Sequence, residues 1–276
     1  MRYHLGLSSY AYYWAAALKP NGKPFTAWDL LDRTVALGLD VVQICENVPL
    51  VGWAESDLER FRESATRQGV LLELGVRSLD FAHLRTAFET AHILGSRILR
   101  FVPWSGSQGQ QRLPGDKLYG FVKALLPLCR EYAITLAIEN YFDIRDEELV
   151  ACVERLGDEH IGICLDTANS TGFLQPPLET VKVLAPYTVS LHLKDFIVLK
   201  PAIGYRVTGV ALGQGWLDVP AVLNIIREAG RQPHVLLELW VDEAESEAAT
   251  LSREDDWVRE SVAYARDQLN IAFAQP

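Results

Sequence analysis

The sequence of 276 residues has only four cysteines, and their spacing suggests neither a disulfide framework nor a cysteine-based metal site. All four lie in apolar stretches, and no two form a CxxC motif. Structural disulfides are typical of oxidising compartments, so we expect reduced core thiols and a cytoplasmic protein. The four residues are Cys45, Cys129, Cys152 and Cys164.

Long apolar runs and clusters of basic residues are also missing. No apolar stretch approaches the roughly 18 residues that a membrane-spanning helix needs, which argues against a membrane protein. The formal net charge is -10 and Lys and Arg are not clustered. Nucleic-acid binding needs such clusters to neutralise phosphates, so we expect a small-molecule partner and no nucleic acid.

The sequence also lacks a GxGxxG motif, and its first predicted strand continues into "SSYAYYW" and not into a glycine-rich turn. This disfavours a doubly wound dinucleotide-binding sheet, which is the alternative fold. Amphipathic helices instead alternate with short apolar runs, which indicates a parallel sheet covered by helices. The eight predicted strands lie in "YHLGLS", "ALGLDVVQI", "RQGVLLEL", "LGSRILRF", "EYAITLAI", "HIGICL", "YTVSLHL" and "QPHVLLEL".

Eight βα units in about 250 residues predict one (β/α)8 TIM barrel, a single α/β domain over residues 1–276. Segments 104–116 and 196–218 are long, polar and rich in glycine, so we expect extended loops there. Near the C-terminus, Val258, Val262, Ala265 and Leu269 have helical spacing and should pack on the barrel. The following "IAFAQP" suggests a surface covered by a partner, and we expect a homodimer.

Four residues with metal-binding side chains stand at the ends of the last four predicted strands. They are Glu139 in "LAIEN", Asp166 in "ICLDTAN", His192 in "SLHLKD" and Glu238 in "LLELW". A single such residue is as easily a helix cap or a satisfied core group. A closed barrel brings all four strand ends to one mouth, where active sites of this fold lie. The pattern therefore predicts a metal site.

Three carboxylates and one imidazole suit a hard or borderline divalent cation. We expect one ion of Mn²⁺, Mg²⁺ or Co²⁺ per chain, and Zn²⁺ is compatible with the same ligands. No glycine-rich loop with basic support follows the last two strands, so the substrate is expected to carry no phosphate. The segment "GVALGQGWLD" is the only candidate for such a loop, and we interpret its glycines as shaping a turn beside the site.

These motifs resemble the xylose isomerase-like TIM barrels, a superfamily of sugar phosphate isomerases and epimerases. It includes ketose 3-epimerases, hydroxypyruvate isomerases, inosose dehydratases and endonuclease IV. The resemblance covers nearly the whole chain, from "YHLGLSSY" to "WVRESVAYAR". It implies that Glu139, Asp166, His192 and Glu238 hold one metal ion. It also implies that Glu139 and Glu238 are the acid and base.

The sequence offers six candidate substrate contacts: Lys194, Asn169, Arg206, Glu46, Trp104 and Tyr10. Many ketose 3-epimerases have a histidine where this chain has Asn169, and Arg206 is the loose counterpart of an arginine in their seventh loop. Lys194 suits an oxyanion or a rim salt bridge equally well. Glu46 and Arg77 fit a rim ion pair better than a substrate contact.

Aromatic side chains cluster at or just beyond the predicted strand ends, where they suit an apolar wall against sugar C–H faces. They are Tyr10, Tyr12, Trp14, Trp104, Phe142, Trp216 and Trp240.

The expected activity is isomerisation or epimerisation of a keto-sugar or polyol derivative through a metal-bound cis-enediolate. Glu139 and Glu238 would exchange the proton from opposite faces of the carbon. Two alternatives remain open. The same ligands serve a decarboxylase or dehydratase acting on a keto-acid or inosose. A non-catalytic sugar-binding protein is the second alternative, and it is disfavoured because no expected ligand is replaced.

Overall fold

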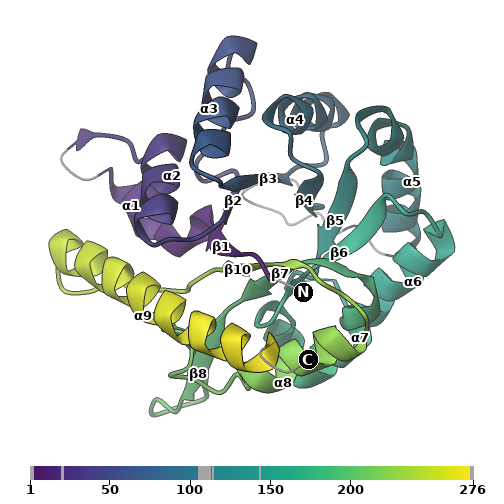
Figure 1. The fold of residues 1–276 in the computed structure, drawn as a ribbon. Coiled ribbons are helices and arrows are strands. Elements are labelled where there is room, and N and C mark those ends of the chain that lie inside the picture. Colours follow the sequence, from purple (N-terminus) through teal and green to yellow (C-terminus); the bar gives the residue numbers. More distant parts are fainter. Residues whose placement is uncertain (1–2, 20–21, 105–112, 114, 143, 274–276) are drawn as a thin grey trace.

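The computed structural model describes residues 3–19, 22–104, 113, 115–142 and 144–273, and it contains a closed barrel of eight parallel strands (Figure 1). Around the barrel the strands follow the order β1-β10-β7-β6-β5-β4-β3-β2, and β2 pairs with β1 to close it. The strands are β1 (Leu5–Ser8), β2 (Val41–Ile44), β3 (Leu71–Arg77), β4 (Ile98–Val102), β5 (Thr135–Glu139), β6 (Ile161–Asp166), β7 (Thr188–Leu193) and β10 (His234–Leu237). The predicted TIM barrel is confirmed.

Helices surround the barrel as an outer ring (Figure 1). They are α1 (Tyr13–Leu18), α2 (Ala27–Ala36), α3 (Glu55–Arg67), α4 (Phe81–Leu94), α5 (Gly115–Tyr132), α6 (Asp146–Leu156), α7 (Pro177–Leu184), α8 (Val219–Glu228) and α9 (Glu247–Phe273). The described residues also form short 3-10 helices, namely η1 (Ser9–Tyr12), η3 (Asn169–Phe173) and η4 (Ala185–Tyr187). Among the described residues, no helix is both long enough and apolar enough to span a bilayer.

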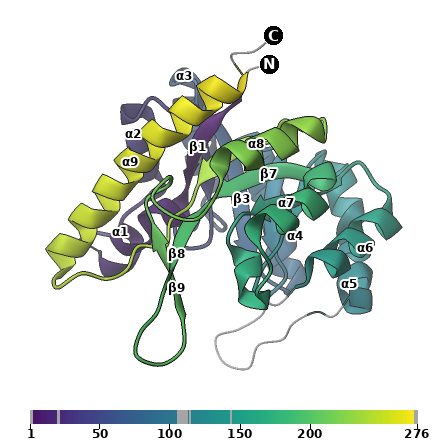
Figure 2. The ribbon, with the colours of Figure 1, turned by 90° about the horizontal axis from the view of Figure 1, so that it is seen from below.

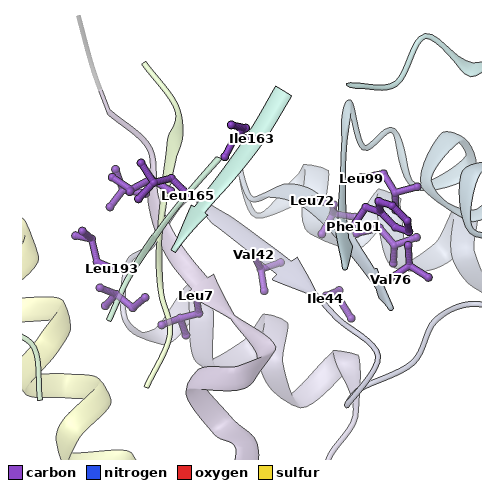
Figure 3. Packing of buried hydrophobic residues seen from close by; sticks show 14 of the residues in the cluster. Leu7, Val42, Ile44, Leu72, Val76, Leu99, Phe101, Ile163, Leu165 and Leu193 are labelled. Carbon is purple, nitrogen blue, oxygen red and sulfur yellow. The ribbon is translucent and has the colours of Figure 1, made fainter. Parts of the chain in front are cut away.

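The main hydrophobic core lies between the strands and the helices. Successive residues of a strand point to opposite faces, and in each barrel strand the aliphatic or aromatic position points outward. Figure 3 shows this outward layer packed together. Its labelled members include Leu7, Val42, Ile44, Leu72, Val76, Leu99, Phe101, Ile163, Leu165 and Leu193.

Many inward positions of the same strands are small or polar, which the uniformly apolar appearance of the sequence did not suggest. Gln43, Glu73 and Arg100 are all fully or almost fully buried inside the barrel. Gly75 makes room for this layer, because a Cβ there would lie 2.5 Å from the Cys45 sulfur and 3.3 Å from Arg100 Cδ. The barrel interior is therefore chemically distinct from the outer core.

The segment after β7 is not the extended loop that the sequence predicted. It forms an antiparallel hairpin of β8 (Asp195–Leu199) and β9 (Arg206–Val210), which projects away from the barrel (Figure 2). The apolar run "FIVL" and the β-branched residues of "RVTGV" are the strand signals that the neighbouring glycines and polar residues obscured. Ile203 and Tyr205, between the two strands, are exposed. The other predicted loop, 104–116, lies largely outside the described residues.

Helix α9 runs along the outside of the barrel, and its C-terminal end lies close to the start of β1 (Figure 2). Val258, Val262, Ala265 and Leu269 are buried in the core cluster, so the predicted packing of this helix is confirmed. The side chains of "IAFAQP" are outside the described residues. The homodimer stays a prediction.

Candidate metal centre and substrate pocket

The four predicted ligand residues come together at the carboxyl ends of the barrel strands. Glu139 and Asp166 are the last residues of β5 and β6, His192 is the next to last of β7, and Glu238 follows β10. All four are buried, with at most 5 % of the residue exposed. A cavity of about 390 Å³ lies above them, and Glu238 is one of the residues that line it.

Asp166, His192 and Glu238 form a compact group of potential ligand atoms, all within 4.8 Å of one another. His192 Nδ1 lies 2.9 Å from Glu238 Oε2 and 3.9 Å from Asp166 Oδ2. None of these three buried atoms makes an aligned hydrogen bond, although Asp166 Oδ2 also lies 2.8 Å from the ammonium of Lys194. The three atoms therefore surround a common position and do not form aligned hydrogen bonds with one another.

This arrangement fits a divalent cation. Buried polar atoms without hydrogen bonds are costly, and a cation shared by two carboxylates and one imidazole would satisfy all three. Asp166 Oδ1 accepts backbone N–H groups from Ala168 and Asn169 at 2.8 and 2.9 Å, which leaves Oδ2 directed to the shared position. This group contains three of the four donors expected from the sequence.

Glu139 also lies beside His192, in a second group of potential ligands that includes Cys164. Both of its oxygens are engaged by other side chains. Oε2 accepts a hydrogen bond from Arg100 Nε, and Oε1 accepts one from Asn169 Nδ2 at 2.9 Å. The structure thus brings all four predicted ligands together, but Glu139 is held differently from the other three.

The two glutamates also differ in acidity. Burial raises the pKa of Glu139, and the nearby Arg100 offsets only part of that effect. Burial acts in the same direction on Glu238, but Lys194 and His192 outweigh it and hold the pKa of Glu238 well below its ordinary value. Glu238 is therefore an ionised carboxylate that faces the pocket.

The polar end of "TVSLHLKDF" has three separate roles. His192 belongs to the ligand group, and Lys194 Nζ lies 2.8 Å from Asp166 Oδ2 and 2.9 Å from Glu238 Oε1. Burial opposes the ammonium charge, but these carboxylates raise the pKa of Lys194 above its ordinary value. Lys194 lines the pocket, so its salt bridges do not remove it from the site.

Asp195 organises the loop after β7. Its carboxylate accepts hydrogen bonds from the backbone N–H groups of Phe196, Gly213, Gly215 and Leu217 at 2.8 to 3.0 Å. Gly215 is required there, because a Cβ would lie 2.2 Å from Asp195 Oδ1. The N–H groups of "GVALGQGWLD" thus bind a carboxylate of the protein. They are not presented to a phosphate.

Arg100 is the main site residue that the sequence reasoning missed. Only 1 % of it is exposed, and it pairs with Glu139 and with Glu46, whose Oε2 lies 3.1 Å from Arg100 Nη1. Arg77 pairs with the same Glu46 at 3.0 Å, as the expected rim ion pair. The signal was a charged residue at an inward position of the apolar run "ILRF".

Three of the six predicted substrate contacts line the pocket, namely Tyr10, Asn169 and Lys194. The other three do not line it, but each contacts a residue that does. Glu46 accepts a hydrogen bond from Tyr10 Oη at 2.9 Å, and the Trp104 ring is 5.3 Å from that of Tyr141. Arg206, on β9, forms an ion pair with Asp242, which lines the pocket.

The predicted aromatic wall is present in part. Tyr10, Trp14, Phe142 and Trp240 line the pocket. Tyr12 does not, because it is buried against Phe25 and Arg33, and Trp216 is 65 % exposed. Tyr13 and Tyr141, which were not predicted, complete the wall.

Comparison with known proteins identifies the family. Residues 31–268 match the family model described as the xylose isomerase-like TIM barrel. The chain belongs to this family, as the sequence motifs suggested. Enzymes are among the proteins that the chain resembles.

A relative from Pectobacterium atrosepticum, 3-oxo-isoapionate decarboxylase, is 31 % identical over 263 residues, which cover 94 % of each chain. A structure of D-psicose 3-epimerase in the presence of D-fructose has a TM-score of 0.72 at 15 % identity, with 96 % of this chain and 99 % of that chain covered. The IolI protein with a binding zinc atom has a TM-score of 0.69 at 17 % identity, with 99 % and 100 % covered. The two structural likenesses establish the fold alone.

Proposed function

We propose that the protein is a divalent-metal-dependent decarboxylase that acts on a 3-oxo acid of the sugar type. The observation that carries this proposal is the difference between the two glutamates. Glu238 lines the pocket, whereas Glu139 is absent from the described lining residues and is engaged on both oxygens. Epimerisation needs a proton-transferring group on each face of the carbon, but loss of CO₂ followed by protonation needs only one.

The charge of the site supports an anionic substrate. Apart from the ion pair of Asp242 with Arg206 and a neutral His192, its buried and lining groups comprise three cations and four carboxylates, so a divalent ion changes the net charge from −1 to +1. The cations are Arg77, Arg100 and Lys194, and the carboxylates are Glu46, Glu139, Asp166 and Glu238. One substrate carboxylate restores neutrality. Arg77, whose side chain is 30 % exposed, is the proposed contact for that group.

We assign Asp166, His192 and Glu238 as metal ligands, with Glu139 as the fourth. A bound divalent ion supplies Lewis acidity that stabilises negative charge on a carbonyl oxygen. As the C–C bond to the carboxylate breaks, CO₂ leaves and the electron pair moves into the adjacent carbonyl. The carbon then takes a proton. Lys194 is the proposed donor, because its ammonium lines the pocket and Glu238, 2.9 Å away, keeps it charged.

The test is to incubate the purified protein and Mn²⁺ with 3-oxo sugar acids, and separately with ketoses, while CO₂ and sugar products are measured. We expect CO₂ from the acids and, in D₂O, one deuterium at the carbon that lost it. Lys194→Met should lower the rate about a hundredfold or more. Lys182→Met, which removes an exposed lysine of α7, is the matched control and should keep the wild-type rate.

The second candidate is ketose isomerisation or epimerisation with Glu139 and Glu238 as the acid and base. It is favoured by the position of both carboxylates beside His192. Deuterium exchange into a ketose without CO₂ release would replace the decarboxylase proposal with this one. Absence of turnover for both substrate classes would contradict both.

A further inference from the structure

A file of buried polar side chains leads from the candidate metal centre through the barrel to its opposite end. His192 Nε2 lies 2.9 Å from Gln43 Oε1, and Gln43 Nε2 donates to Glu73 Oε2 at 2.8 Å. The other oxygen of Glu73 lies 2.6 Å from His234 Nδ1. Because His234 is the first residue of β10, the file ends at the amino side of the strands, away from the pocket.

All side chains of the file are shielded from water except that of its last member, His234. Gln43 and His192 are 0 % exposed and Glu73 is 1 % exposed. Gln43 and Glu73 are register partners on β2 and β3, so the barrel fixes their side chains next to each other. The side chain of His234 is 25 % exposed, and its imidazole pairs with the otherwise isolated Glu73 charge. The proposed catalytic chemistry does not use Gln43, Glu73 or His234.

The donor and acceptor roles along the file follow from one charged end. An ionised Glu73 only accepts hydrogen bonds, so the neighbouring atom of Gln43 must be its NH₂ group. The amide oxygen of Gln43 then faces His192 and only accepts. His192 Nε2 must therefore carry a hydrogen, which leaves Nδ1, beside Asp166 and Glu238, as the nitrogen that a metal ion would bind.

We propose that Gln43 and Glu73 are positioning residues that set the ring orientation and tautomer of His192 for metal binding. This inference rests on the metal site of the proposed function, but it does not depend on which reaction the site performs. Partners of this kind typically contribute 10-fold to 100-fold to metal affinity. Here the residues that orient His192 extend across the barrel. Glu73 acts on His192 through Gln43, and Glu73 is itself paired with His234.

The first measurement is the Zn²⁺ affinity of the metal-free protein, by chelator competition without substrate. Gln43→Met keeps the side-chain length but removes the acceptor, and it should weaken binding about 10-fold or more. Glu73→Gln permits the Gln43 amide to turn over, so it should weaken binding as well. Ser190→Ala removes a 3.1 Å hydrogen bond to Glu73 that lies off the path, and it should stay within about threefold of wild type.

The second measurement separates tautomer control from loss of structure. In ring ¹⁵N spectra of the zinc-loaded wild type, the signals lost in His192→Gln should show a protonated Nε2 and an unprotonated Nδ1. Glu73→Gln should change this pattern, and its circular dichroism should match the wild type. Zinc affinity of Gln43→Met within twofold of wild type would overturn the proposal, as would an unchanged His192 pattern in Glu73→Gln.

If Gln43→Met does not fold, the Glu73→Gln spectrum still decides the question. A wild type that binds no zinc would overturn both the positioning role and the ligand assignment. If the wild type binds zinc with the predicted protonation pattern of His192 but releases no CO₂, only the proposed decarboxylation is overturned.

Discussion

At the scale of single residues, we expect replacement of Arg100 to be strongly destabilising, because Arg100 is a buried cation that pairs with both Glu46 and Glu139. Removal of one partner from a buried ion pair leaves an uncompensated charge. We predict that Arg100→Met lowers the free energy of unfolding of the metal-free protein by about 3 to 5 kcal/mol. Arg100→Lys should recover only part of this loss, because an ammonium cannot reproduce the planar fork of a guanidinium. Urea denaturation in a chelating buffer measures both effects.

Arg60→Met is the matched control. Arg60 pairs with Asp57 on the surface of α3, and its side chain is 72 % exposed. Exposed pairs contribute about 1 kcal/mol or less. Equal losses for the two arginine variants would show that the barrel ion pairs do not differ from surface ones.

Site residues at the ends of the strands could be predicted from the sequence, whereas those in the middle of the strands could not. Glu139, Asp166, His192 and Glu238 could be predicted because each interrupts an apolar run at its end. Gln43, Glu73 and Arg100 interrupt their strands in the middle, where the sequence was interpreted as a uniform core. A period-two analysis of each strand would have assigned them to the barrel interior. The partners of each, such as Glu46 for Arg100, depend on three-dimensional packing.

At the scale of elements, the contact between α9 and α1 depends on one buried carboxylate. Glu254 accepts hydrogen bonds from the backbone N–H groups of Trp14 and Ala15, at 2.6 and 3.0 Å. These bonds tie α9 to the helix that carries Trp14 into the pocket wall. Burial raises the pKa of Glu254 to about 7, although the two backbone bonds act against the shift.

This pKa predicts a loss of stability as the pH rises. Below its ordinary value of 4.5, Glu254 is protonated in both states. Between pH 5 and 7 the unfolded chain releases this proton more readily than the folded protein does. The free energy of unfolding should therefore fall over that window by up to about 3 kcal/mol. Urea denaturation at pH 5 and at pH 7.5 measures the difference.

Glu254→Gln cannot ionise, so it should show a smaller fall than wild type between the two pH values. The exposed Glu247→Gln, on the first turn of the same helix, should follow the wild-type profile and serves as the control. If the Glu254→Gln and wild-type profiles are parallel, Glu254 does not titrate in this window.

The elements themselves were predicted well where one signal dominated. Each predicted apolar run forms a barrel strand, and a helix precedes the next barrel strand in every unit, although the β8–β9 hairpin intervenes after β7. The hairpin β8–β9 was missed because its length and glycines are typical of loops. Its pairing follows from cross-strand contacts, and Asp195 fixes the returning chain through backbone groups that carry no sequence signal.

At the scale of the whole molecule, the metal should act as a ligand of the folded state alone. The three candidate ligand atoms of Asp166, His192 and Glu238 come from different βα units, so the unfolded chain does not present them together. At a free ion concentration of about 100 times Kd, binding adds about 2.7 kcal/mol to stability. For a domain of this size, that raises Tm by about 5 to 10 °C.

We therefore predict one divalent ion per chain by elemental analysis and a Tm that falls by this amount on chelation. His192→Ala should melt at one temperature with or without Mn²⁺, since it removes a ligand without breaking the outer core. The quadruple variant Glu139→Ala, Asp166→Ala, His192→Ala, Glu238→Ala supplies the decisive contrast. Full metal content in that variant would place the ion elsewhere, because no metal-binding side chain would then remain among the four assigned ligands.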